Sequence, residues 1–424
     1  SDFSHNTADG IEFDTDLGNY GSAYNSAGHP AGQPTLYIGD STINYNGGDG
    51  IHIDNNIGVG SDEYQFVYIS HTQIAHNGGD GIHVYNYNYG GSQLQALVVA
   101  NGSDVSHNTG NGISLATTAY HTPEQVNLLE VDGSSISSNG VYGISLDSYV
   151  AVAFISDQAF YASGSKFDGN ASGGVNMTDA ALGAYYAFQV IKLNNNEFAD
   201  NIGSGLYAIF GSLGDYAAGQ YVYSTDDVFK GNAGFGLYAG FGALGQYSTA
   251  VQHVDLTGDT ASANYLGVGI TGYAAASALS QKIGVVDGAF NGNEYVGMYV
   301  QSISEYGSQI TSNISAKNAE FDGNGAGLVF SSYADGTSAG AARVSITGST
   351  FSGNVAGVYL YADHTTQHAL IQGNSFTDNS LYGIEAYAAN GSHQNFNVHT
   401  NTHSGDGANY YFGHDGTSTQ HIVY

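Results

Sequence analysis

The sequence predicts an all-β fold, a solenoid in which short parallel strands stack coil upon coil. Asparagines recur at an almost constant spacing, apolar and polar residues alternate after each of them, and no stretch has the periodicity of a helix. Because the repeat covers nearly all of the 424 residues, we expect one solenoid and not several globular domains.

Each repeat is marked by an anchor asparagine, which follows an apolar residue and precedes a glycine and an aliphatic residue. The steps from Asn46 to Asn232 are 31 residues each, later steps run from 25 to 32, and the first step is 40 because residues 25–34 are inserted. The thirteen anchor asparagines are Asn6, Asn46, Asn77, Asn108, Asn139, Asn170, Asn201, Asn232, Asn264, Asn293, Asn324, Asn354 and Asn379.

Three strands are expected in each repeat. One follows the glycine, as in the segment IHV at 82–84, where alternation indicates a strand with one buried face. A second contains the apolar residue three positions before the anchor, which is a phenylalanine in most later repeats, as at Phe351. A third lies further back, as at Val344 and Ile346. Three strands and three turns make one triangular coil.

Two local expectations follow for the turn that holds the anchor. A buried amide both donates and accepts, so asparagines stacked from coil to coil would satisfy one another. The glycine after the anchor would either adopt a positive φ or allow a close approach of the backbone.

This spacing resembles the right-handed parallel β-helix family, the fold of pectate lyases and phage tailspikes, in which a turn asparagine forms a ladder and interior residues stack. The resemblance implies a single-stranded right-handed parallel β-helix of about 13 coils of about 31 residues, with three short strands per coil, over residues 1–424 as one domain. It leaves function open, because this fold hosts lyases, hydrolases, epimerases, adhesins and surface-layer proteins. Neither end shows a cap, so we expect a fragment or repeating unit of a longer chain, or rods that associate end to end.

Composition narrows the classes of partner. The chain has 37 Asp and Glu against 6 Lys and Arg, a formal net charge of −31. Such a charge disfavours nucleic acids and anionic membranes, and no apolar segment has the length to insert into a membrane. With no cysteine, disulfides and Cys-ligated zinc are excluded. The Gly-, Asn-, Asp-, Ser- and Tyr-rich composition is typical of bacterial exported surface proteins.

Three aspartates form the candidate metal site. Asp9, Asp49 and Asp80 each lie three residues after an anchor asparagine, so successive coils would stack them, and a column of carboxylates can bind Ca²⁺. The alternative is that these aspartates only stabilise the turn through their own backbone. His52 and His83 also stack but lack a third zinc ligand, and we expect them to be exposed polar residues.

A tyrosine-rich column is the candidate binding or assembly surface. Tyr207, Tyr238, Tyr299 and Tyr359 are expected at the outward position of the strand after the glycine, with Thr271 between the middle two. Exposed tyrosines can contact sugars or a second protein surface. The alternative is that they stabilise the strand ladder.

Basic residues supply the catalytic alternative. His253, Lys282, Asn313 and Arg343 are expected in one outward column, beside Asp255. If the chain is an enzyme, His253, Asp255, Lys282 and Arg343 would carry proton transfer. The catalytic motifs of the resembling lyases, epimerases and polygalacturonases are absent.

We therefore expect a non-enzymatic extracellular structural or adhesive rod of a bacterial surface, matrix, surface layer or filament. Its partners would be further copies, end to end or laterally, or a surface polysaccharide, and no cofactor is expected except possible Ca²⁺ binding. The alternatives are a polysaccharide lyase, epimerase or hydrolase, and a carbohydrate-binding module.

Overall fold

The computed structural model describes residues 1–18, 22–23, 35–245 and 249–424, so the predicted insertion at 25–34 lies outside the described residues. Strands and turns make up this part of the chain. Over these ranges no helix is long and apolar enough to span a membrane.

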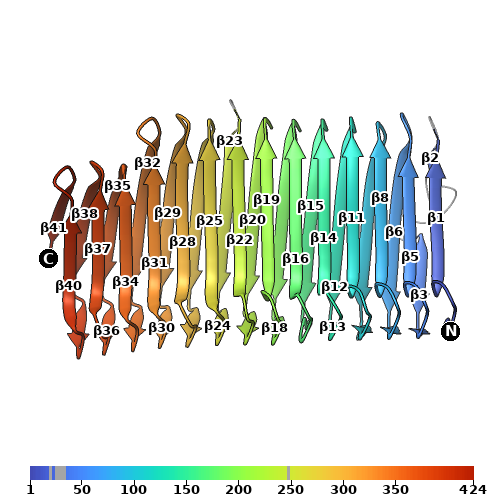
Figure 1. Cartoon of the computed structure of the whole chain (residues 1–424), viewed down its shortest axis with the longest axis horizontal. Helices are drawn as coiled ribbons and strands as arrows, with labels where there is room; N and C mark the ends of the chain where they lie inside the picture. Colours follow the sequence, from blue (N-terminus) through green and yellow to red (C-terminus); the bar gives the residue numbers. More distant parts are fainter. Residues whose placement is uncertain (19–21, 24–34, 246–248) are drawn as a thin grey trace. The chain divides into compact units, whose positions relative to one another are not determined.

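The chain divides into two compact units, Ser1–Ala217 and Ala218–Tyr424, and each is a right-handed parallel β-solenoid (Figure 1). Together they contain about 12 turns of about 31 residues, which confirms the predicted fold class. This number of turns is close to the predicted number of about 13 coils. The prediction of a single domain over residues 1–424 stays a prediction.

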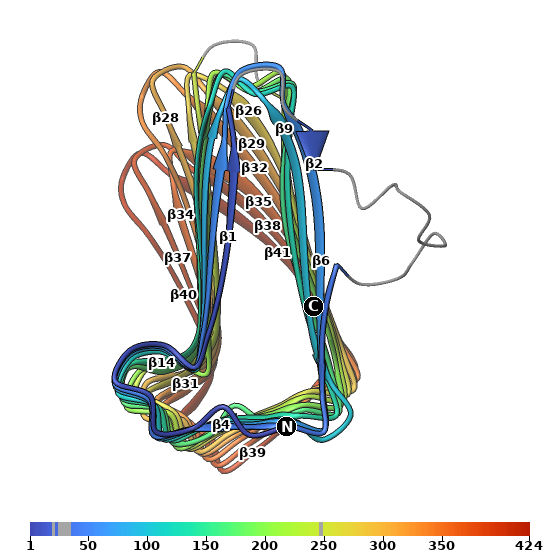
Figure 2. The same cartoon turned by 90° about the vertical axis from the view of Figure 1, so that its right-hand side faces the viewer.

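Three parallel sheets build each unit. The first sheet contains the strands after the anchor asparagine, the second contains the next strand of each coil, and the third contains the three-residue strands before the anchor. Viewed along the axis on which the coils stack, the first two sheets form two long walls and the third forms a short base (Figure 2).

In the unit Ser1–Ala217 the strands of each sheet lie side by side in chain order. The first sheet consists of β1 (Ile11–Leu17), β5 (Ile51–Ile57), β8 (Ile82–Tyr89), β11 (Ile113–Tyr120), β14 (Tyr142–Ala151), β16 (Gly173–Leu182) and β19 (Leu206–Leu213). The second consists of β2 (Ser22–Ala23), β6 (Asp62–Ser70), β9 (Ser92–Ala100), β12 (Glu124–Asp132), β15 (Ile155–Ser163) and β17 (Tyr186–Asn194), with β3 (Leu36–Gly39) also paired to β6. The third consists of β4 (Thr42–Asn44), β7 (Gln73–Ala75), β10 (Asp104–Ser106) and β13 (Ser135–Ser137). The strand β18 (Glu197–Ala199) belongs to a separate sheet, and isolated bridges of Lys166 link it to β13.

The unit Ala218–Tyr424 repeats this arrangement. Its first sheet consists of β22 (Phe235–Leu244), β25 (Leu266–Ala275), β28 (Val296–Glu305), β31 (Ala326–Ala334), β34 (Ala356–Asp363), β37 (Tyr382–Ala389) and β40 (Ala408–His414). Its second consists of β20 (Ala217–Thr225), β23 (Thr249–Thr257), β26 (Ala278–Val286), β29 (Gln309–Lys317), β32 (Ala339–Thr347), β35 (Thr365–Gln372), β38 (His393–His399) and β41 (Thr419–Val423). Its third consists of β21 (Val228–Lys230), β24 (Thr260–Ser262), β27 (Ala289–Asn291), β30 (Glu320–Asp322), β33 (Thr350–Ser352), β36 (Ser375–Thr377) and β39 (Thr402–Ser404).

The anchor asparagines form the predicted ladder. In Asn77 the backbone N and Nδ2 donate to Oδ1 of Asn108 over 3.1 and 2.9 Å, and Nδ2 also donates to the carbonyl of Ile43 over 3.1 Å. The ladder extends one coil beyond the predicted asparagines, because Asn379 donates to Oδ1 of Asp406 over 3.0 and 2.9 Å. A carboxylate accepts both bonds, so Asp406 serves as the acceptor for the last anchor.

The glycine after the anchor is required for close approach, not for a positive φ. A Cβ on Gly81 would lie 2.6 Å from the carbonyl oxygen of Gly112 and 2.7 Å from Nδ2 of Asn108. The positive φ falls instead on the residue before the anchor, as at His76 (58°) and Ser138 (57°).

The interior is apolar near the base and polar between the long walls. Phe321, Phe351 and Phe376 stack with ring centroids 4.9 and 5.0 Å apart, as the phenylalanine column predicts. Between the walls lies a glutamine ladder that the sequence reading missed, in which Gln281 donates to Gln252 and Gln394 donates to Gln367, each over 2.8 Å.

Candidate functional site

The outer face of six consecutive strands of the second sheet differs in charge from the rest of the chain. The strands β26, β29, β32, β35, β38 and β41 contain no Asp or Glu, although the chain has a net charge of −31. We call this outer surface the basic face. Its basic residues are Lys282, Lys317, Arg343, His368, His393, His399 and His421.

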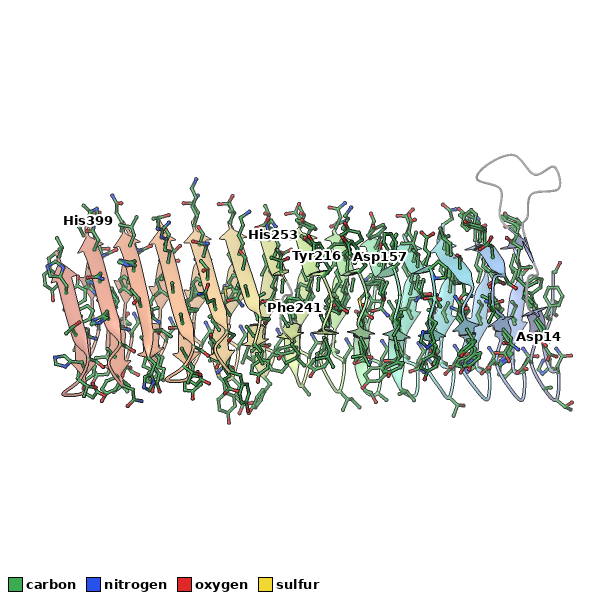
Figure 3. All side chains as sticks on the ribbon, turned by 90° about the horizontal axis from the view of Figure 1, so that it is seen from above. Asp14, Asp157, Tyr216, Phe241, His253 and His399 are labelled. Atoms are coloured by element: carbon green, nitrogen blue, oxygen red, sulfur yellow. The ribbon has the colours of Figure 1, made fainter. Side chains whose placement is uncertain are left out.

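Strand alternation directs these side chains outward. In β29 every second residue is buried, and Ile314 is 2 % exposed whereas its neighbour Asn313 is exposed. The same phase holds in β26, where Lys282 is exposed between two buried residues. In Figure 3 the labelled side chains of His253 and His399 project outward along the same side of their unit.

The register confirms the predicted basic column and lengthens it. His253 pairs with Lys282, Lys282 with Asn313, and Asn313 with Arg343. The column continues over three more coils, through His368, Asn395 and His421, which the sequence reading missed. The absence of Asp and Glu from these three strands was the signal that would have revealed it.

A shallow groove of about 630 Å³ runs beside this column. Small residues at the next outward position, Gly284, Ser315 and Ser345, leave room beside the longer side chains of Lys282 and Arg343. Toward β41 the lining adds polar and apolar residues, namely His368, Leu370, Asn395, Asn397, His421 and Val423. The groove therefore presents cations and amides above a floor of small residues.

At the first strand of the column, the predicted catalytic residues meet in part. Nε2 of His253 lies 2.7 Å from Oδ2 of Asp255 and 3.1 Å from Nζ of Lys282. Arg343 is two strands beyond Lys282, at about 10 Å along the sheet from the usual strand spacing, so it does not join this cluster. Among the described residues Arg343 has no hydrogen-bond or ion-pair partner for its side chain.

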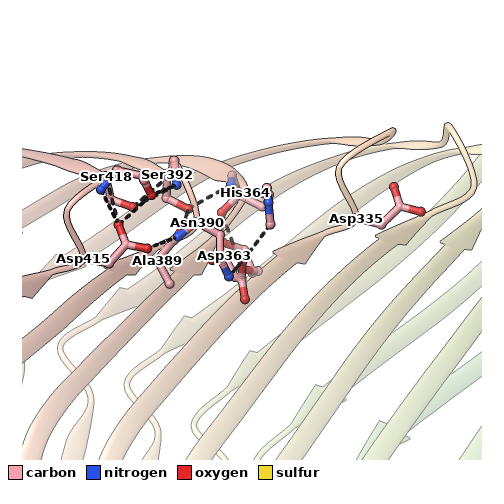
Figure 4. Close-up of polar contacts among 12 residues, drawn as sticks. Asp335, Asp363, His364, Ala389, Asn390, Ser392, Asp415 and Ser418 are labelled. Carbon is pink, nitrogen blue, oxygen red and sulfur yellow. Dashed lines mark hydrogen bonds and ion pairs between the residues drawn. The ribbon is translucent and has the colours of Figure 1, made fainter.

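Carboxylates lie in the turns that lead into the last strands of the basic face (Figure 4). Asp415 accepts from the backbone N of Asn390 over 2.6 Å, and Asp335 accepts from that of Tyr306 over 2.8 Å. Hydrogen bonds from these amides and from neighbouring Ser and Thr residues hold the pKa of both carboxyls well below the usual range. Asp363 is occupied by His364 and Asn390, each over 2.8 Å.

The predicted metal residues Asp9, Asp49 and Asp80 do stack, but both carboxylate oxygens of Asp49 and of Asp80 already have partners. Oδ1 of Asp49 accepts the backbone N–H of Asp80 over 2.6 Å, and Oδ1 of Asp80 accepts that of Asn111 over 2.6 Å. Across the described ranges no group of three His, Asp or Glu is arranged to hold a metal ion.

His52 and His83 stack with ring centroids 5.1 Å apart and pair with these carboxylates. Nδ1 of His83 lies 3.0 Å from Oδ2 of Asp80, and this hydrogen bond raises the pKa of His83. Burial alone would lower the pKa of His52, but hydrogen bonds and charges of Asp49 and Asp54 outweigh it and raise that pKa. The two imidazoles thus belong to a turn network.

The tyrosine column has a different register from the predicted one. Tyr238 pairs with Gly269 and Gly269 with Tyr299, so glycine, not Thr271, lies between the two tyrosines. The Tyr238 ring packs over Gly269 and its hydroxyl contacts Thr271. Tyr299 pairs with Val329 and Val329 with Tyr359, while Tyr207 pairs with Asn176 in the other unit. Partial burial raises the pKa of Tyr299 and Tyr359, so these rings lie partly within the surface.

The fold and site define a parallel β-solenoid with a carboxylate-free basic face. Comparison of the sequence with models of known families and with curated proteins finds no match.

Proposed function

We propose that the chain is a non-enzymatic, extracellular adhesive solenoid of a bacterial surface or matrix that binds an anionic polysaccharide along its basic face. The observation that carries the proposal is the exclusion of Asp and Glu from six consecutive strands of a chain with 37 such residues. Carboxylates would repel an anionic ligand, and their exclusion from one face leaves Lys282, Lys317 and Arg343 as its fixed charges.

The chemistry of the groove favours a polysaccharide over other polyanions. Its lining has the amides of Asn313, Asn395 and Asn397, which can donate to and accept from hydroxyl groups. Most of it lies on a sheet face, where neighbouring strands already pair the backbone groups that a peptide strand would need. A net charge of −31 on the whole chain disfavours nucleic acid.

The test compares two triple variants of equal net charge. The chain has six Lys and Arg residues, of which three lie on the basic face and three elsewhere, Lys166, Lys192 and Lys230. Binding of immobilised dextran sulfate and polygalacturonate is measured at low salt, with neutral dextran as the control. We expect the variant with Lys282, Lys317 and Arg343 changed to alanine to lose at least about tenfold in affinity. The variant with the other three lysines changed to alanine should bind like the wild type, and equal losses in both would refute a specific face.

The contacts of His253 keep a catalytic alternative open. Its proximity to Asp255 and Lys282 resembles an acid–base arrangement, and it lies at one end of the groove column. We favour binding without catalysis because Arg343 is too far along the sheet to act on the same bond. Release of reducing or unsaturated ends from the bound polysaccharide, lost in His253→Ala, would establish the enzyme instead.

A further inference from the structure

We propose that acid pH strengthens polyanion binding at the basic face, because four of its seven basic residues are histidines and no carboxylate shares their strands. This inference rests on the proposed function and concerns the regulation of the same site. Imidazole is the side chain that ordinarily gains charge between pH 8 and 5. The face has three Lys and Arg residues and four histidines, and each imidazole that binds a proton would add one positive charge.

Two of the histidines lie in the groove column. His368 on β35 has Arg343 as its partner on β32 and Asn395 as its partner on β38. His421 on β41 also pairs with Asn395. The strands packed on either side thus present one guanidinium and one amide to these imidazoles, so a proton on either ring would face no carboxylate of the sheet.

The other two histidines flank the column on β38. Nδ1 of His393 lies 2.6 Å from Oγ1 of Thr419, and its partner on β35 is Thr366. Nδ1 of His399 lies 2.8 Å from Oδ1 of Asn397, and its partner on β35 is Gln372. Both rings therefore have neutral partners, in contrast to His83, which is bound to Asp80.

The acidic turns at one end of the face would not cancel the gain in charge. Backbone amides and hydroxyls already bind Asp335 and Asp415 and lower the pKa of both carboxyls (Figure 4). Asp363 is held by His364 and Asn390. At the far end of the column, Asp255 faces His253 and Lys282. Because Asp335 and Asp415 stay ionised over this pH range, the histidines dominate the change in charge of the face.

The test uses dextran sulfate, whose sulfate groups keep their charge between pH 7.5 and 5.5. We expect the affinity of the wild type to rise about tenfold over this range at constant ionic strength. A variant with His368, His393, His399 and His421 changed to asparagine should show a rise of less than about twofold. The matched control changes four exposed histidines of the other unit, His5, His76, His107 and His121, whose positive φ asparagine tolerates, and should keep the tenfold rise.

A second measurement needs no variant. Calorimetric titration of the wild type at pH 6.5 in buffers of different ionisation enthalpy should show net proton uptake on binding. An affinity that is the same at both pH values, or an acid gain that survives in the four-histidine variant, overturns the inference. If the pH inference fails but the triple variant of Lys282, Lys317 and Arg343 binds more weakly than the wild type at pH 7.5, the proposed function stands. If that variant binds like the wild type, the proposed function fails as well.

Discussion

Asn139 and Asn170 are joined by two hydrogen bonds, because the backbone N and Nδ2 of Asn139 both donate to Oδ1 of Asn170, over 3.0 and 3.1 Å. Asn170 in turn donates through Nδ2 to the carbonyl of Ile136 and to Oδ1 of Asn201, over 3.2 and 3.1 Å. Asn170 thus satisfies polar groups of two neighbouring coils at a position that is fully buried.

We expect Asn170→Ala to lower the free energy of unfolding by about 3–5 kcal/mol, because it leaves several buried donors and acceptors without partners. Chemical denaturation monitored by circular dichroism measures the change. The control is Asn194→Ala, an exposed asparagine at the end of β17, which should change stability by less than about 0.5 kcal/mol. A similar small effect at Asn170 would contradict the role of the ladder.

Gly81→Ala should destabilise the chain by about 2–3 kcal/mol, because the new methyl group would overlap Gly112 and the Asn108 amide. The comparison is Gly211→Ala, also in a strand, where the nearest atom to the new Cβ is the carbonyl oxygen of Asp179 at 4.0 Å. Thermal melting of both variants distinguishes the steric overlap at Gly81 from the general effect of replacing glycine by alanine in a strand. Equal melting temperatures of the two variants would show that the backbone of the next coil leaves room for a methyl group at Gly81.

Asp179 makes stability depend on pH. It is 3 % exposed, and burial, opposed only in part by the nearby Ser148 hydroxyl, raises its pKa to about 8. Since the folded state holds this proton more tightly than the unfolded state, stability is highest at acid pH and falls as pH rises from about 4 to about 8. Burial also raises the pKa of Glu63 and Asp259, each to about 7, which adds to the same trend.

We therefore expect Asp179→Asn to be more stable than the wild type at pH 8, by about 5 kcal/mol, and the gain to shrink toward pH 4. Unfolding curves at several pH values measure it. The control is Asp132→Asn, which removes a carboxyl from the exposed end of β12. A constant difference between Asp179→Asn and the wild type at every pH would show that Asp179 does not hold a proton at neutral pH.

The coil is predictable from the sequence because two of its parts tolerate few residue types. An anchor must donate and accept in a buried turn, and the column that contains Phe321 and Phe351 must fill the same space in each coil. The interior glutamines were not predicted, because an isolated Gln is usually exposed. The alternation of the strand would have revealed them, since Gln252 lies two positions before the buried Val254 and therefore on the same side of the strand.

The far half of the basic column was missed because the coils shorten. Lys282 and Asn313 are 31 residues apart, whereas Arg343 and His368 are 25 apart, so a fixed repeat length loses the register. Strand pairing sets the alignment through hydrogen bonds of the backbone, not through residue count. The error in the tyrosine column has another origin, because Tyr238 and its partner Gly269 are 31 residues apart, the usual repeat length, whereas the expected Thr271 is 33 residues from Tyr238.

Calcium should leave the stability of the chain unchanged. Oδ1 of Asp49 and of Asp80 already accept backbone amides over 2.6 Å, and their Oδ2 atoms face His52 and His83 over 2.9 and 3.0 Å. A cation there would have to displace these partners. We expect equal melting temperatures in millimolar Ca²⁺ and in EDTA. A rise with Ca²⁺ that disappears in Asp49→Asn would instead establish the predicted metal column.

Asp255 is the carboxylate that touches the basic column, since its Oδ2 lies 2.7 Å from Nε2 of His253. Its negative charge offsets the adjacent cations and would repel an anionic ligand at this end of the column. We expect Asp255→Asn to bind dextran sulfate about two- to fivefold more tightly at low salt, and the difference to diminish as salt screens the charges.

The control for this effect is Asp322→Asn, which changes the net charge equally but lies in β30 of the third sheet. It should leave the affinity unchanged, because its distance from the basic face screens its charge. If both variants gain equally, the ligand responds to the total charge of the chain and not to the basic face. If only Asp255→Asn binds dextran sulfate more tightly, the ligand lies along the column that begins at His253.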